Sequence, residues 1–267
     1  MKKFILSASV VAAMLAGTNA KAQLLDEQNV TVTMDLQPIL QLNMNGSQNV
    51  DFVFDQISEY VGGITQYGAT NLQVSSTVSW DLYAAGFSSA AAGGALLWDN
   101  QVVYGGDTDP NSVTTLPLTL LELHQDKVNP NTTGFASTTG GTASYNVAFA
   151  SSVTALGQNN VYATTAPYTR PAATEKYIAG HNSTSAFVAG GSYLISVGGL
   201  VGNSSNYSYT MDYRITPGLP AIFPRATSGS GNTSASAALN SAGGASSGLY
   251  AQPGVYTMNV KYVLVEN

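Results

Sequence analysis

The sequence predicts an all-β fold of antiparallel strands, arranged as a sandwich or a barrel with long loops. Three observations support this prediction. Apolar and polar residues alternate with a period of two in several blocks, as they do along a strand with one buried face. Clusters of Gly, Pro, Asn and Ser separate the blocks, and the sequence contains no convincing amphipathic helix. Many short strands divided by such clusters are typical of antiparallel sandwiches and barrels.

Residues 1–22 have the pattern of a secretory signal peptide. Lys2 and Lys3 precede an apolar run over residues 4–16, and residues 20–22 supply small side chains at the usual cleavage spacing. The alternative is a transmembrane anchor, which needs roughly 20 apolar residues, more than this run contains. We therefore expect a protein that is secreted to the outside or the surface of a bacterial cell. We expect no transmembrane segment after cleavage.

The strongest alternation lies close behind this leader, from Val30 to Met44. Pro38 interrupts it, and because proline cannot donate to a strand ladder, it predicts an edge, a bulge or a break. The alternation resumes after Asn45-Gly46, a turn signal. The apolar residues of these first blocks are Val30, Val32, Met34, Leu36, Leu40, Leu42, Met44, Val50, Phe52 and Phe54.

Three further blocks predict strands, and the rest of the chain gives weaker signals. In the first of these blocks, residues 72–82, Trp80 shares the apolar register and is expected in the core. The clear blocks are residues 72–82, 207–215 and 256–264, and the weaker candidates are residues 113–123, 143–153 and 186–197.

Residues 226–248 are almost entirely Ser, Gly, Ala, Thr and Asn. Such a stretch buries too little apolar surface to offset the entropy lost on ordering, so we expect a flexible loop before the last strand. Residues 23–267 are numerous enough to bury one substantial core, and we expect them to form a single domain.

Composition excludes several functional classes. The chain carries 9 Lys and Arg against 15 Asp and Glu, a formal net charge of −6, and so lacks the basic stripe of a nucleic-acid binder. It has no cysteine, which rules out disulfides, thiol enzymes and Cys-ligated zinc. Only 9% of the residues are charged, so uncharged polar residues must cover most of the surface.

Residue types suited to catalysis are sparse. His124 and His181 are the only histidines, and neither lies near a Gly-x-Ser-x-Gly motif or a glycine-rich oxyanion loop. We expect both to be ordinary surface histidines, and we expect the protein to be no enzyme and to need no cofactor. A secreted hydrolase is the weakest of three functional hypotheses.

Two motifs allow ligand binding. Asp107, Asp109 and Asn111 are weak calcium candidates, because oxygen atoms at alternate positions suit a hard cation. A tight turn at this point explains the same residues equally well. Trp98 and Tyr104 lie in expected loops, where aromatic rings can stack on sugars, so a secreted carbohydrate-binding adhesin is the second hypothesis.

The two ends of the chain together resemble pilus subunits of the chaperone-assisted type. In that family an N-terminal strand of alternating apolar residues completes the immunoglobulin-like sandwich of a neighbouring subunit. The C-terminal strand commonly has a glycine fourteen places from the end and an aromatic residue next to last. Residues 29–36 and Gly254 match these features, whereas Glu266 occupies the next-to-last place and the usual disulfide is absent. Residues 52–60 and 79–83 also resemble uncharacterised secreted proteins of Bacteroidota.

The resemblance implies an immunoglobulin-like, pilin-like β-sandwich. It supports the first hypothesis, a non-enzymatic structural subunit of an extracellular filament, fimbrium or cell-surface assembly that contacts its own copies or other surface subunits. An N-terminal assembly strand would add to the edge of a sheet, in its own subunit or in a neighbour. The residues assigned to the assembly strand are Val30, Val32, Met34 and Leu36, and those assigned to the C-terminal strand are Gly254, Tyr256, Met258, Val260, Tyr262 and Leu264.

Overall fold

The computed structural model describes eleven stretches of the chain, and it divides the chain into two units, Met1–Gln37 and Pro38–Asn267. The expected signal peptide, the calcium candidates Asp107, Asp109 and Asn111, and the expected loop 226–248 lie outside the described residues. The described residues are 28, 30–88, 96–105, 112–127, 145–149, 159–164, 169–172, 176–181, 187–194, 207–217 and 250–266.

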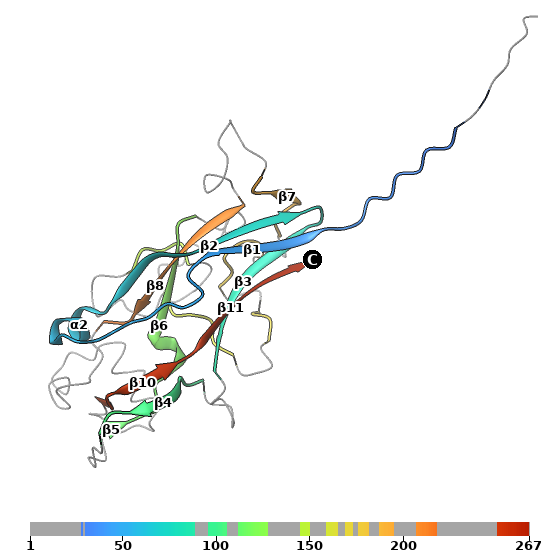
Figure 1. Cartoon of the computed structure of the whole chain (residues 1–267). Helices are drawn as coiled ribbons and strands as arrows, with labels where there is room; N and C mark the ends of the chain where they lie inside the picture. The colour runs from blue at the N-terminus through green and yellow to red at the C-terminus, as the bar shows by residue number, and fades with distance from the viewer. Residues whose placement is uncertain are drawn as a thin grey trace, which may run out of the picture. The chain divides into compact units, whose positions relative to one another are not determined.

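Strands dominate the described elements, and helix is confined to two short stretches, so the all-β class is confirmed. Within the described part of the chain, no helix is long and apolar enough to cross a membrane. The elements are β1 (Leu40–Gly46), α2 (Ile57–Gly62), β2 (Thr65–Ser76), β3 (Trp80–Phe87), β4 (Asp99–Val103), β5 (Ser112–Val113), η1 (Leu118–Leu120), β6 (Leu121–Gln125), β7 (Gly191–Ser192), β8 (Ser208–Ile215), β9 (Tyr250–Ala251), β10 (Gly254–Thr257) and β11 (Asn259–Glu266) (Figure 1).

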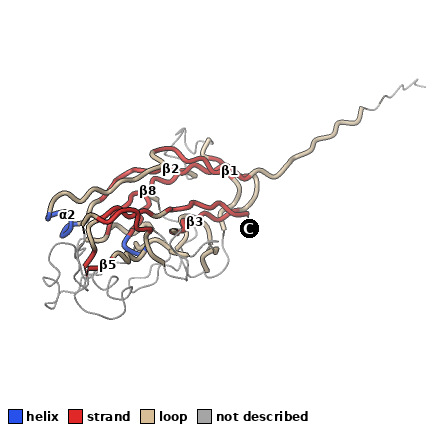
Figure 2. Tube along the Cα trace, turned by 60° about the horizontal axis from the view of Figure 1, so that its bottom comes forward, coloured by secondary structure: helices blue, strands red, loops and turns tan. Residues whose placement is uncertain are grey.

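The longer strands all pair antiparallel. The largest sheet has the order β1-β2-β8-β6, and β7 pairs with the end of β2. β11 pairs with the whole of β3, and β10 pairs with β4. The two-residue pair β5–β9 is parallel. Figure 2 shows the described strands in red and the described connections between them in tan.

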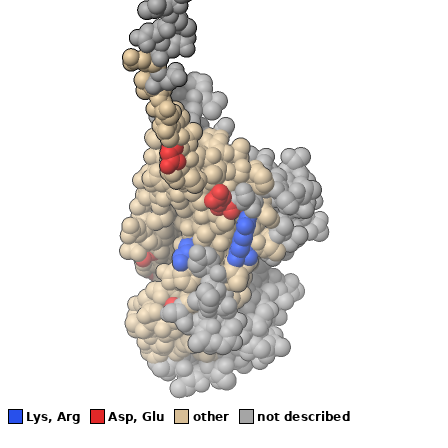
Figure 3. All heavy atoms as spheres, turned by 90° about the vertical axis from the view of Figure 1, so that its right-hand side faces the viewer, with Lys and Arg blue, Asp and Glu red and all other residues tan. Residues whose placement is uncertain are grey.

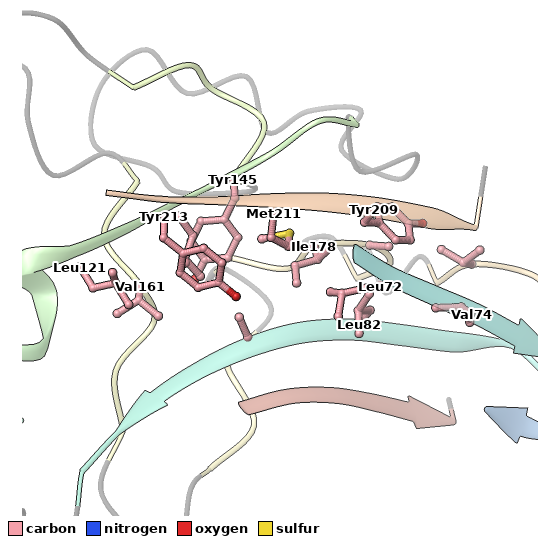
Figure 4. Close-up of a cluster of buried hydrophobic side chains, with 14 of the residues drawn as sticks. Leu72, Val74, Leu82, Leu121, Tyr145, Val161, Ile178, Tyr209, Met211 and Tyr213 are labelled. Atoms are coloured by element: carbon pink, nitrogen blue, oxygen red, sulfur yellow. The ribbon is translucent and has the colours of Figure 1, made fainter. Parts of the chain in front are cut away.

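The core lies between the largest sheet and the β3–β11 pair. Every second residue of β2 from Thr70 to Ser76 is buried, which is the pattern expected of a strand with one inner face. β8 faces β2 and β3 with Tyr209 and Met211 (Figure 4). Side chains in this cluster that are at most 1% exposed include Leu72, Val74, Trp80, Leu82, Leu123, Ile178, Tyr209 and Met211.

The expected block 72–82 is two strands rather than one. β2 ends at Ser76 and β3 begins at Trp80. The Ser76 hydroxyl donates to the carbonyl oxygen of Val78 at 2.6 Å and accepts from its N–H at 3.1 Å, which stabilises a tight turn. Val78, Trp80 and Leu82 keep the apolar register of Leu72 and Val74, and Ser76 is the one polar residue in that register. Periodicity alone therefore gives only a weak sign of the turn. Trp80 is 0% exposed, as predicted.

The strands at both ends of the domain are shorter than the sequence blocks that predict them. β1 begins only at Leu40, so Pro38 precedes the strand and residues 30–39 belong to none. The expected C-terminal strand is divided between β10 and β11 at Met258. A Cβ atom at Gly254 would collide with the carbonyl oxygen of Val102, so the close approach of β10 to β4 requires glycine there.

Candidate functional site

Residues 30–37, which we call the N-terminal segment, expose an alternating apolar face. Val30, Val32, Met34 and Leu36 are 86%, 85%, 78% and 82% exposed. Single exposed apolar residues are normal on a protein surface, but four in strand register form a continuous apolar face, which is typical of an interaction site. These are the four residues expected to form an assembly strand, and all four side chains are exposed to solvent.

Two unpaired strand edges lie on one side of the domain. Among the described strands, β1 pairs only with β2 and β11 pairs only with β3. β1 and β11 contact each other, and the end of β11 lies near the start of β1 (Figure 1). Leu42 packs into the core, but Leu40 and Met44 on the same face of β1 are still 37% and 47% exposed. This side of the core is therefore incompletely covered.

Residues 50–54, which we call the wall segment, continue beyond β1 with alternating burial. Val50, Phe52 and Phe54 pack against the core, whereas Asp51 and Val53 are exposed. No backbone N–H of the wall segment donates a hydrogen bond to another residue of the described ranges. The side chains of the wall segment therefore pack as those of a strand do, but its backbone N–H groups form no hydrogen-bond ladder with the described residues.

A cavity of about 970 Å³ lies between the wall segment and β10–β11. Phe52 and Phe54 line it on one side, and Tyr256 and Val260 line it on the other. We call it the edge cavity. Ligand pockets have volumes of roughly 300–1,000 Å³, so the edge cavity is at the large end of that range.

A chain of hydroxyl groups crosses the domain at this cavity. The Tyr213 hydroxyl is 2.9 Å from the Thr70 hydroxyl and is also hydrogen-bonded to the Tyr262 hydroxyl. These bonds connect β2 and β8 of one sheet with β11. Burial raises the pKa of both tyrosines above the ordinary value of 10.0, because an ionised phenolate would lose its hydration.

These buried tyrosines predict a loss of stability in alkali. In the unfolded chain a tyrosine ionises near pH 10, whereas the folded state holds the proton to higher pH. The folded protein therefore binds more protons above pH 10, and its free energy of unfolding falls as the pH rises through this range. We expect Tyr262→Phe to reduce that slope by about 1.4 kcal/mol per pH unit in denaturant titrations. Tyr104→Phe, at an exposed tyrosine, is the control, and equal slopes in both variants would contradict the prediction.

Both histidines contact carboxylates. His124 Nδ1 lies 2.8 Å from Asp212 Oδ2, and His181 Nδ1 lies 3.1 Å from Asp81 Oδ2. Their side chains are only 23% and 17% exposed, so the expectation of ordinary surface histidines is wrong. The two aspartates lie 88 and 100 positions from these histidines in the sequence, so no local motif indicates the contacts.

Asp81 fixes a loop against β3. Its side chain is fully buried, and its carboxylate accepts hydrogen bonds from the Arg170 guanidinium and from the backbone N–H of His181 at 3.1 Å. The His181 ring stacks on the ring of Tyr177, with centroids 4.8 Å apart. A Cβ atom at Gly180, where φ is +77°, would collide with the Asp81 carboxylate. We call Asp81, Arg170 and His181 the β3 latch.

The remaining ligand candidates are placed as follows. The Trp98 ring is partly buried, and its Nε1–H donates to the carbonyl oxygen of Pro117 at 3.1 Å. Tyr104 is 64% exposed, and both rings line the edge cavity. The described ranges contain no group of three or more His, Asp or Glu residues placed to hold a metal ion. Figure 3 shows a face on which the drawn Lys, Arg, Asp and Glu residues are few, and one acidic group lies beside a basic one.

No family model matches the chain, and no match was found among the curated proteins.

Proposed function

We propose that this protein is a non-enzymatic structural subunit of an extracellular filament or cell-surface assembly, and that it polymerises by β-strand addition of the N-terminal segment. The main observation is the exposure of Val30, Val32, Met34 and Leu36 in strand register. In strand addition, an extended segment forms backbone bonds to a free sheet edge and buries every second side chain. We also propose that the domain is an immunoglobulin-like, pilin-like sandwich with one incomplete edge.

Burial of the apolar face of the N-terminal segment can contribute substantially to the free energy of association. Burial of one such side chain contributes roughly 1.5–3 kcal/mol, so four contribute about 6–12 kcal/mol before losses. Association and ordering remove much of this, about 4–15 kcal/mol depending on the model. The net affinity therefore depends on the backbone bonds as well. Strand addition supplies both contributions at once, which a purely side-chain contact does not.

Assembly is tested on the purified mature chain, starting at Gln23. We expect sedimentation velocity to show oligomers that grow with protein concentration, and electron microscopy to show filaments. The apolar segment drives this assembly, so a chain that begins at Pro38 should stay monomeric. A mature chain that remains monomeric over the whole concentration range would refute the proposed function.

A further inference from the structure

We propose that the side chains of Lys176 and Asn160 become joined by an amide bond, which forms within a single chain after it has folded. This modification does not depend on the proposed assembly. It gives a chain that has no cysteine a covalent cross-link, and its formation requires no oxidant.

The amine of Lys176 is buried, which is rare for lysine. The residue is 4% exposed, and its Nζ donates a hydrogen bond to the backbone carbonyl oxygen of Asn160 at 2.7 Å. Nζ also lies 5.3 Å from the centre of the buried ring of Tyr145. Burial of an ammonium group costs free energy, whereas an amide is neutral, so conversion of the amine to an amide removes this cost.

The side chain of Asn160 supplies a carboxamide next to this amine. Its Oδ1 atom is buried and accepts no hydrogen bond from the described residues, which is unfavourable for an amide in a folded protein. Nζ of Lys176 already lies against the backbone carbonyl group of Asn160, and Cγ is only a few covalent bonds away from that group. Rotation about the side-chain bonds of the two residues therefore brings Nζ to Cγ.

Glu122 is placed to accept a proton during the reaction. Glu122 and Asn160 are antiparallel partners, and two backbone hydrogen bonds of 2.9 Å flank the pair. In a pair of this kind the Cα atoms are about 4.5 Å apart, and the opposite side chains share one face. The Glu122 side chain is 1% exposed, and its carboxylate accepts a hydrogen bond from Arg214 Nε at 2.7 Å.

The reaction exchanges one bond for another. The Lys176 ammonium group gives one proton to the Glu122 carboxylate, and the neutral Nζ attacks Cγ of Asn160. The Nζ–Cγ bond forms and the Cγ–Nδ2 bond breaks, while a second proton passes from Nζ to Nδ2. The leaving ammonia takes back the proton held by Glu122, so one ammonium ion is released. Proximity accelerates this attack, and burial keeps water, the competing nucleophile, away from Cγ.

The cross-link connects segments that pair with different sheets. Asn160 pairs with Glu122 of β6, which belongs to the largest sheet. Ala179, in the same described segment as Lys176, pairs with Leu82 of β3. The amide bond therefore ties a segment beside the largest sheet to a segment beside the β3–β11 pair.

Mass spectrometry of the purified mature chain tests this bond. We expect the intact chain to be about 17 Da lighter than its sequence requires, which is the mass of one ammonia. Trypsin should fail to cut after Lys176. Chymotrypsin cuts after Tyr168, which lies between the two joined residues in the sequence, and should yield one branched peptide that contains both Asn160 and Lys176.

Two matched variants separate this lysine from lysines in general. Lys176→Arg should have the full mass calculated for its sequence, because a guanidinium group keeps its proton and is a poor nucleophile. Lys261→Arg, at an exposed lysine, should retain the deficit. Asn160→Leu, which is similar in shape to the wild type, should restore cleavage after Lys176, and thermal melts show whether each variant is folded.

Two results would overturn the inference. One is complete tryptic cleavage after Lys176 in wild-type chains that were folded before digestion. The other is a mass deficit that maps to a cyclised Gln23 or to a succinimide at Asn45-Gly46, since each of these products also lacks one ammonia. The mass of the chain is independent of its oligomeric state, so failure of assembly leaves this test intact.

Discussion

Replacing Val32 and Met34 together with aspartate should abolish assembly and leave the domain folded. Each substitution removes an apolar side chain whose burial contributes roughly 1.5–3 kcal/mol, so the pair should weaken association by about 3–6 kcal/mol, or roughly 10²–10⁴-fold. Both side chains are highly exposed in the single chain, so the free energy of unfolding should not change. Sedimentation velocity over a concentration series and a thermal melt measure the two effects.

The matched control carries the same charges on the opposite face. Thr31→Asp with Thr33→Asp should assemble much like the wild type, because these positions are turned outward when the apolar face is buried. If the two double variants lose assembly equally, charge rather than strand register controls the process. A drop of several degrees in the melting temperature of the Val32/Met34 variant would show that the segment pairs within its own domain.

Asp81→Ala should lower the free energy of unfolding by about 3–5 kcal/mol, as expected when one partner of a buried ion pair is removed. The substitution leaves the Arg170 guanidinium and the backbone N–H of His181 without the carboxylate that accepts from them. Urea unfolding followed by fluorescence measures the change. Asp51→Ala, at an exposed carboxylate, is the control and should change the free energy of unfolding by no more than about 0.5 kcal/mol.

Two outcomes would contradict this account of the β3 latch. One is a loss below about 1 kcal/mol for Asp81→Ala, which is the range of surface ion pairs. The other is a loss for Arg170→Ala that exceeds the loss for Asp81→Ala. The Arg170 side chain is 35% exposed and can reach water when its partner is missing, whereas the Asp81 carboxylate is fully buried and serves two other groups.

Period-two alternation was enough to predict the all-β class and much of the strand content. It identified β8 closely and placed Trp80 in the core, but it merged β10 and β11 into one strand. It failed where the same alternation passes through a turn, as at Ser76–Val78, and where an extended stretch alternates without pairing, as in the wall segment. Side-chain period reports burial, whereas ladder formation depends on a second strand that local sequence does not specify.

The short helix α2 was also missed, for a different reason. It spans six residues, too few for a helical period to show. The available signal was Gln56 with Glu59 three residues later: the Glu59 carboxylate accepts from the Gln56 N–H at 2.9 Å, as in a capping box. Gln56 is not one of the preferred residues for this position, so the signal was weak.

The candidate site was predictable in its parts but not in its arrangement. Alternation pointed to the N-terminal segment, to the inner residues of the wall segment and to the C-terminal strand. The Tyr213–Tyr262 contact and the β3 latch join residues 49 to 100 positions apart, and the two walls of the edge cavity come from opposite ends of the domain's sequence. Such contacts follow from the order of strands in the sheets, and sequence patterns fix that order only for neighbours joined by tight turns.

The orientation of β1 has a mechanical consequence for a filament of the proposed kind. β1 leaves the N-terminal segment at Leu40, runs antiparallel to β2 over its whole length, and has Met44 at the edge cavity near its other end. A pull transmitted from a neighbour through the N-terminal segment to Leu40 and resisted at the other end of β1 acts along the axis of this strand. Its ladder with β2 is then loaded in shear, so the hydrogen bonds share the tension and must rupture together instead of opening one after another from an end.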